Sequence, residues 1–87
     1  MAETPLFTYY EEIEALIQRL SSVGAEDWAE SLTTALRGGT TSGEILSSTG
    51  VVLRDLAESP DARHYKVEDE VIRLQTECHS LLDGSIK

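Results

Sequence analysis

The sequence predicts an all-α protein, a small irregular four-helix antiparallel bundle. The strongest signal is a stripe between residues 67 and 82, in which apolar residues recur at spacings of four, three, four and three: Val67, Val71, Leu74, Cys78 and Leu81. Such spacing places them on one side of a helix, which must be buried against other helices. Three further segments show the same periodicity, separated by short polar or glycine-containing stretches. Short loops between helices favour antiparallel neighbours.

The first helix is predicted over residues 8–22, with an apolar stripe formed by Ile13, Leu16, Ile17 and Leu20. Two starts fit the sequence. Pro5 suits the first position of a helix, whereas Thr8 and Glu11 have the spacing of a capping box. We prefer the start at Thr8. Gly24 is expected to end the helix.

The second helix is predicted over residues 25–37, with an apolar face formed by Trp28, Leu32, Ala35 and Leu36. Trp28 is the only tryptophan, and its size makes it the expected main anchor of the core. Gly38 and Gly39 follow the last apolar position. They are expected to end the helix.

The third helix is predicted over residues 42–58, because Thr41 and Glu44 match a capping box and Pro60 follows the last apolar position. Gly50 interrupts the pattern and allows two interpretations: close approach of another helix, or division into two short helices. Residues 59–64 are read as a loop or a helix entry. The fourth helix is predicted over residues 64–83, ending at Gly84.

Composition limits the function. The 87 residues allow one domain, and 40% hydrophobic content is ordinary for a folded soluble chain. A formal net charge of -9 disfavours nucleic acid and anionic membranes as partners, and makes a basic protein the natural complement. No apolar run approaches the length of a membrane span. The first five residues lack the features of a secretory signal, so we expect a cytoplasmic protein.

The sequence predicts no catalytic, cofactor-binding or metal-binding residues. Cys78 and His79 are adjacent, and neighbouring helical residues point ~100° apart, so they do not form a nucleophile–base pair. We expect Cys78 to be a buried apolar thiol. Asp61 and His64 are three residues apart, but the chain has one cysteine, two histidines and no Glu-x-x-His element, so a metal site is not expected. The chain is therefore predicted not to be an enzyme.

Several short motifs occur in a recognisable order: Gly24, Trp28-Ala29, Leu32, Leu53-Arg54-Asp55-Leu56 and Ser59-Pro60-Asp61 before a final helix. In this order the chain resembles a group of small uncharacterised bacterial all-helical proteins, some of them similar to immunity proteins that accompany toxins. The segment 47–52 departs from the glycine-rich stretch expected ahead of the Asp-Leu pair. The resemblance implies a helical fold and transfers no binding residue.

Two functions remain open. The first is a non-enzymatic acidic protein-binding module, such as an immunity or inhibitor protein for a basic partner. Its expected contact residues begin the first two helices, where helix dipoles also favour negative charge: Glu11, Glu12, Glu14, Glu26, Asp27 and Glu30. The alternative is a self-associating structural or regulatory protein, in which the first and last helices form a homodimer.

Overall fold

The computed structural model describes the backbone of residues 5–86 and the side chains of residues 8–83. It contains five helices and, in this part of the chain, no strand: α1 (Pro5–Ser22), α2 (Glu26–Gly38), α3 (Ser42–Glu58), α4 (Pro60–His64) and α5 (Glu68–Ile86). The predicted all-helical class is confirmed. The number of helices differs from the prediction, because the additional α4 occupies the segment read as a loop or helix entry.

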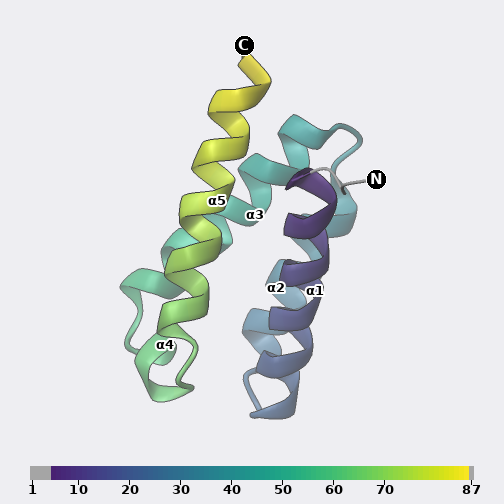
Figure 1. Ribbon diagram of the computed structural model, residues 1–87. Helices are drawn as coiled ribbons and strands as arrows, with labels where there is room; N and C mark the ends of the chain where they lie inside the picture. The colour runs from purple at the N-terminus through teal and green to yellow at the C-terminus, as the bar shows by residue number, and fades with distance from the viewer. Residues whose placement is uncertain (1–4, 87) are drawn as a thin grey trace.

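The four long helices each lie against two others. α1 and α2 run in opposite directions side by side and form a hairpin, as Figure 1 shows. α3 packs against α2 and α5, and α5 returns to contact α1. The short α4 connects α3 to α5 and contacts both. The chain therefore encloses one shared interior between α1, α2, α3 and α5.

α1 begins at Pro5, so the predicted start at Thr8 is wrong. Proline has no N–H to lose and its fixed φ suits the first helical turn, and this preference outweighs the capping-box spacing of Thr8 and Glu11. Thr8 lies inside the helix. Glu11 is also beyond the first turn, which contains no acidic residue. The expected dipole stabilisation of the acidic residues in α1 is therefore absent.

The same backbone motif follows α1 and α4. After α1, Ala25 N–H donates to the Leu20 carbonyl at 2.8 Å and Gly24 N–H donates to the Ser21 carbonyl at 3.2 Å, with Gly24 at φ 87°. After α4, Val67 and Lys66 repeat these two bonds, and Lys66 adopts φ 60°. Both are Schellman motifs. The second one separates α4 from α5, so the single helix predicted over residues 64–83 is wrong at its start.

α3 has the predicted bounds and is capped at its start by Thr41. Glu44 N–H donates to Thr41 Oγ1 at 3.2 Å, and the Glu44 carboxylate accepts from the Thr40 N–H at 2.8 Å and from the Thr40 hydroxyl at 2.9 Å. The hydrogen bonds from Thr40 lower the pKa of Glu44. α3 continues through Gly50, so this glycine does not divide it.

α5 extends beyond its predicted end, because Gly84 keeps a helical backbone and the helix reaches Ile86. Glycine inside a helix costs only about 1 kcal/mol relative to alanine, so it does not force a stop.

The short helix α4 is capped at its start by Ser59, whose Oγ accepts from Asp61 N–H at 3.1 Å. Pro60 is thus the first residue of α4 as well as the residue that follows the end of α3.

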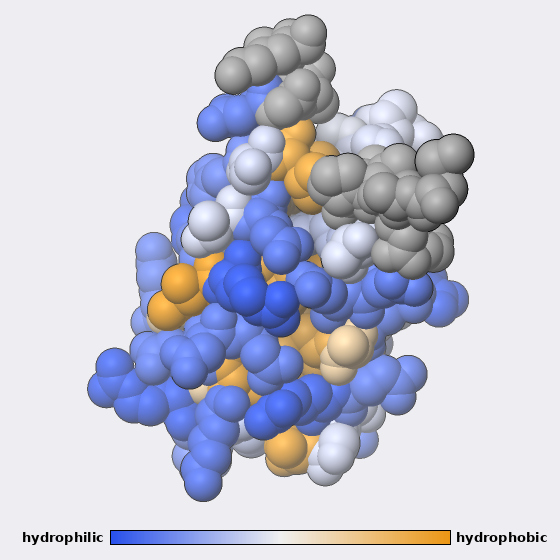
Figure 2. All heavy atoms as spheres, viewed as in Figure 1, coloured by the Kyte–Doolittle hydropathy of each residue, from blue (hydrophilic) through white to orange (hydrophobic). Residues whose placement is uncertain are grey.

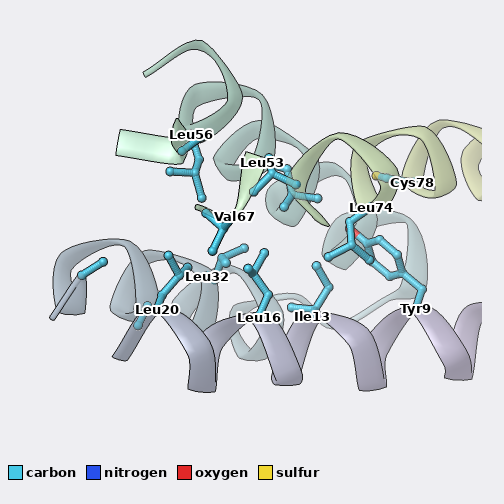
Figure 3. Packing of buried hydrophobic residues seen from close by; sticks show 14 of the residues in the cluster. Tyr9, Ile13, Leu16, Leu20, Leu32, Leu53, Leu56, Val67, Leu74 and Cys78 are labelled. Atoms are coloured by element: carbon cyan, nitrogen blue, oxygen red, sulfur yellow. The ribbon is translucent and has the colours of Figure 1, made fainter. Parts of the chain in front are cut away.

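The core confirms the predicted stripes of α1 and α5. Figure 3 shows side chains from α1 pointing toward residues of α2, α3 and α5. The buried residues include Val67, just before α5, and the following residues of the four long helices: Tyr9, Ile13, Leu16, Leu20, Leu32, Leu53, Leu56, Val71, Leu74 and Cys78. Trp28 is only half-buried at the edge of this cluster, so it is not the central anchor that the sequence predicted. Tyr9 is the largest fully buried side chain of the described residues.

Candidate functional site

The acidic residues predicted to bind a partner do not share one environment. Five of them are exposed on the outer surface of the α1–α2 hairpin: Glu11, Glu14, Glu26, Asp27 and Glu30. We call these five residues the acidic hairpin surface. Glu12 is different, because it lies between α1 and α5 and its side chain is 27% exposed. The structure therefore separates Glu12 from the other predicted contact residues.

Within the acidic hairpin surface, the carboxylates are spread along the hairpin. Glu26 begins α2 beside the last turn of α1, since Ala25 N–H bonds to the Leu20 carbonyl. Glu11 precedes Leu20 by nine residues, which is about 14 Å along a helix. Because α1 and α2 are antiparallel, the acidic residues near the start of α1 and those at the start of α2 lie toward opposite ends of the hairpin. Together they line a long surface and do not form a single cluster.

A shallow groove of about 260 Å³ runs between α1 and α2 on this side. Its lining includes Glu14 and Gln18 of α1 and Thr33 and Arg37 of α2, above the apolar side chains of Ile17 and Leu36. Residues three or four positions apart share a helix face. Glu26 and Glu30 therefore lie on the same stripe as Thr33 and Arg37, and Glu11 on that of Glu14 and Gln18. The groove itself is lined by one carboxylate, that of Glu14 on α1, and by one arginine, Arg37 on α2.

Ion pairs leave the acidic hairpin surface unneutralised. Among the described side chains, the ion pairs are Arg19–Glu70, Arg54–Asp55, Arg63–Glu68 and Arg73–Glu12. None of them includes a residue of the acidic hairpin surface. Arg19 belongs to the hairpin, but it is directed to α5, where its Nε lies 3.3 Å from Glu70 Oε1. The five carboxylates thus remain available to a cation from outside.

A second groove, of about 280 Å³, lies between α3 and α5. Its lining includes Gly50 and Val51 of α3, His79 and Leu82 of α5, and the side chain of Arg54. Gly50 lets the two helices approach closely, because a Cβ atom there would lie 3.0 Å from Cys78 Sγ. Of the two interpretations of Gly50, close helix approach is therefore the one observed. The sequence had indicated the glycine but not the groove.

The neighbouring Cys78 and His79 lie in different environments, as predicted. The Cys78 side chain is buried and its thiol donates to the Leu46 carbonyl at 3.1 Å, whereas His79 is exposed. Burial raises the pKa of the Cys78 thiol, which is the opposite of what a nucleophile requires. The thiol therefore serves packing between α5 and α3.

The side chains of Asp61 and His64 likewise contact different partners and do not form a pair. Asp61 Oδ2 accepts a 2.8 Å hydrogen bond from Trp28 Nε1, and the His64 ring packs edge-on against Tyr65 with centroids 4.8 Å apart. Across the described part of the chain, no three His, Cys, Asp or Glu side chains are grouped as ligands for a metal ion. None of the helices within residues 5–86 is long and apolar enough to cross a membrane.

Comparison with known proteins identifies no relative of this chain. No protein-family model matches the chain, and no curated protein or solved structure is significantly similar to it. The resemblance to small bacterial helical proteins therefore stays a prediction. Any function must be argued from the surface itself.

Proposed function

We propose that this chain is a non-enzymatic, cytoplasmic protein-binding module whose acidic hairpin surface docks a basic protein. In this proposal its scaffold is an irregular antiparallel four-helix bundle, with α4 as a connector. The observation that carries the proposal is that all five carboxylates of the acidic hairpin surface are exposed and none is in an ion pair. Unneutralised charge spread over two rigid helices is suited to long-range attraction of a basic partner.

Such a surface acts mainly on the rate of association. Complementary charge steers two proteins together before they touch, and salt screens this attraction over about 8–10 Å at ordinary ionic strength. A fast, stoichiometric binder of this kind fits an immunity or inhibitor protein, which must reach its target before the target acts. The resemblance in the order of motifs favours the same role.

The test compares two triple variants that each remove three negative charges. The first, E11Q/E14Q/E30Q, alters the acidic hairpin surface, while the second, E58Q/D69N/D83N, alters exposed carboxylates on α3 and α5. Wild type and both variants serve as bait for proteins of the host, and association rates are then measured for a captured basic protein at several salt concentrations. We expect slower association and a flatter salt dependence for the first variant alone. Equal slowing of association in both variants would show that only the net charge of the chain matters, and would refute the acidic hairpin surface as the docking site.

Self-association is a second candidate, supported by a different surface. Val51 on α3 is 47% exposed and Ile72 on α5 is 49% exposed. Val51 lines the α3–α5 groove, and Ile72 lies on the same stripe of α5 as Gln75 and His79. Apolar groups on this side would support a homodimer through α3 and α5, rather than through the first and last helices.

Light scattering across a range of protein concentrations distinguishes this candidate. A homodimer through α3 and α5 predicts a mass that rises with concentration and falls back to the monomer in V51N/I72Q. The matched control is Val23→Asn, because Val23 is also exposed, at 43%, but lies between α1 and α2. A constant monomer mass would exclude self-association through this surface.

A further inference from the structure

The contact between α1 and α5 is made by charged side chains as well as by the core. Arg73 Nη1 of α5 donates to Glu12 Oε2 of α1 at 3.0 Å, and Arg19 of α1 reaches Glu70 of α5 at 3.3 Å. Figure 2 shows that hydrophilic side chains cover most of the face formed by these two helices, with small apolar patches between them. Two ion pairs therefore join α1 to α5 at their surface.

The Glu12 carboxylate is satisfied on one side only. Its Oε2 accepts from Arg73, whereas its Oε1 is buried and, among the residues that the structure describes, has no hydrogen-bond donor. A buried acceptor that has lost water and gained no donor bears the full desolvation cost. The arrangement is complete only if a further donor reaches Oε1.

Glu77 is placed to supply that donor. It follows Arg73 by four residues, so both side chains lie on the stripe of α5 that faces Glu12. Burial raises the pKa of Glu77, and the charge of Glu12 and the hydrogen bond that protonated Glu77 makes to Glu12 raise it further, while Arg73 acts in the opposite direction. Two adjacent carboxylates repel each other when both are ionised, and neither can donate a hydrogen bond until one is protonated.

We propose that Glu77 and Glu12 share one proton, and that this proton fastens α5 to α1 more firmly as the pH falls. The Glu77 carboxylate takes up a proton from water, and its new O–H group donates to Glu12 Oε1. Glu12 Oε2 keeps its bond to Arg73, so each oxygen of the Glu12 carboxylate then has a donor. The repulsion between the two carboxylates disappears in the same step.

Two neutral titratable groups near this pair, Tyr9 and Cys78, keep their protons through the neutral range. Burial raises the pKa of Tyr9 on α1, and the charge of Glu77 adds to this rise. Burial also raises the pKa of Cys78 on α5. From α3, Arg54 lies in the groove beside Gln75 and His79, on the opposite side of α5 from Glu77. The remaining charged groups between α1 and α5 are Arg19, Glu70 and Arg73, which form ion pairs.

The direction of the pH effect follows from the raised pKa. A carboxyl group that binds its proton more tightly in the folded chain adds stability that is fully present below its unfolded pKa. That stability is lost as the pH rises through the folded pKa. The junction between α1 and α5 is therefore firmer below the folded pKa of Glu77 than above it.

Carboxyl ¹³C NMR on the full chain tests the shared proton directly. The titration midpoint of Glu77 is expected above that of a glutamate in an unfolded peptide, and it should fall in Glu12→Gln. The matched control is Glu14→Gln, which removes one charge from the exposed side of α1. If the Glu77 midpoint is the same in wild type and Glu12→Gln, or moves equally in the control, the shared proton is excluded.

A second variant tests the mechanical consequence. In Glu77→Gln the amide N–H can donate to Glu12 Oε1 without any proton uptake, and helix propensity is nearly unchanged. Urea denaturation at pH 7 should give a lower unfolding equilibrium constant for Glu77→Gln than for Glu14→Gln, which has the same net charge. The difference should shrink as the pH falls and wild-type Glu77 becomes protonated. Equal stability of the two variants at pH 7 would overturn the proposal.

Discussion

Trp28 Nε1 donates a 2.8 Å hydrogen bond to Asp61 Oδ2, across 33 residues of sequence. The bond joins α2 to the short α4, which is too short to be stable alone. It also explains why the indole is half-buried at the edge of the core, because a Trp N–H at the boundary must find an acceptor. The residue expected to fill the core thus holds the α3–α5 connection in place.

We predict that removing the indole N–H donor lowers the free energy of unfolding more than replacing its carboxylate acceptor by an amide. Trp28→Phe keeps an aromatic ring and leaves Asp61 without its donor, so the free energy of unfolding should fall by about 1–3 kcal/mol. The matched control is Asp61→Asn, whose carbonyl oxygen can still accept, and it should cost less. Urea denaturation followed by circular dichroism measures both. Equal costs for the two variants would show that the hydrogen bond is not the source of the loss.

The two Schellman motifs give a paired prediction, because one uses glycine and the other lysine at the left-handed position. Gly24→Ala should destabilise the chain by about 1–2 kcal/mol, since Gly24 has φ 87° and a Cβ disfavours this conformation. Lys66 bears that cost already at φ 60°. Lys66→Gly should therefore be more stable than its charge-matched control Lys66→Ala by about 1 kcal/mol. Thermal unfolding of the three variants checks both signs, and a less stable Lys66→Gly would contradict the motif.

A third prediction concerns the close approach of α3 and α5. In Gly50→Ala the gain in helix propensity is about 1 kcal/mol, but overpacking typically costs about 1–3 kcal/mol. The new Cβ would lie 3.0 Å from Cys78 Sγ, which is buried and bonded to Leu46, so the sulfur has little room to move. We expect Gly50→Ala to destabilise the chain.

The same substitution should become stabilising once the sulfur is removed. In a Cys78→Ala background, Gly50→Ala keeps the propensity gain and loses the clash, so a double-mutant cycle should show coupling between the two positions. Gly43→Ala is the control within α3, because a Cβ at Gly43 meets nothing within 4 Å. Additive effects of Gly50→Ala and Cys78→Ala in chemical denaturation would show that the two residues do not compete for space.

Local periodicity was sufficient to predict the buried stripes of α1 and α5. The stripes through Ile13, Leu74 and Cys78 are buried as predicted, because burial on one side of a helix imposes its own spacing on the sequence. Gly24 was also predictable, since its left-handed conformation is one that glycine favours. Lys66 takes the same conformation without any residue signal, and this is why the break between α4 and α5 was missed.

The candidate site was less predictable, because neighbouring acidic residues look alike in sequence. Glu11, Glu12 and Glu14 were treated as one group, yet Glu12 faces Arg73 on a helix 61 residues away and the other two face solvent. The position of Glu77 beside Glu12 likewise depends on how α5 packs against α1. Only tertiary contacts separate a surface carboxylate from one that ties two helices together.

The hydrogen bond between Tyr9 and Thr49 gives a prediction about asymmetry. The two hydroxyl oxygens lie 2.7 Å apart in the core, and Thr49 Oγ1 also donates to the Ile45 carbonyl at 2.8 Å. Tyr9→Phe leaves Thr49 bonded to α3. Thr49→Val leaves the buried phenol with the Cys78 sulfur, a weak acceptor, as its remaining hydrogen-bond partner. We expect Thr49→Val to cost about 1–3 kcal/mol and Tyr9→Phe to cost less. Urea denaturation at pH 7 ranks the two, and the reverse order would show that the phenol is satisfied without Thr49.

The same tyrosine predicts how the chain responds to alkali. Burial raises the pKa of Tyr9 well above its ordinary value of 10.0, with the hydrogen bond between Tyr9 and Thr49 opposing the rise. A phenol with a raised folded pKa contributes stability that is fully present below its unfolded pKa and is lost as the pH rises toward the folded value. Wild type should therefore lose stability between about pH 10 and 12 more steeply than Tyr9→Phe, which has no phenol to ionise. The control is Tyr10→Phe, one residue away and only partly buried, measured by denaturation at each pH. Alkaline slopes that are the same in wild type and Tyr9→Phe would show that the ionisation of Tyr9 is not linked to unfolding.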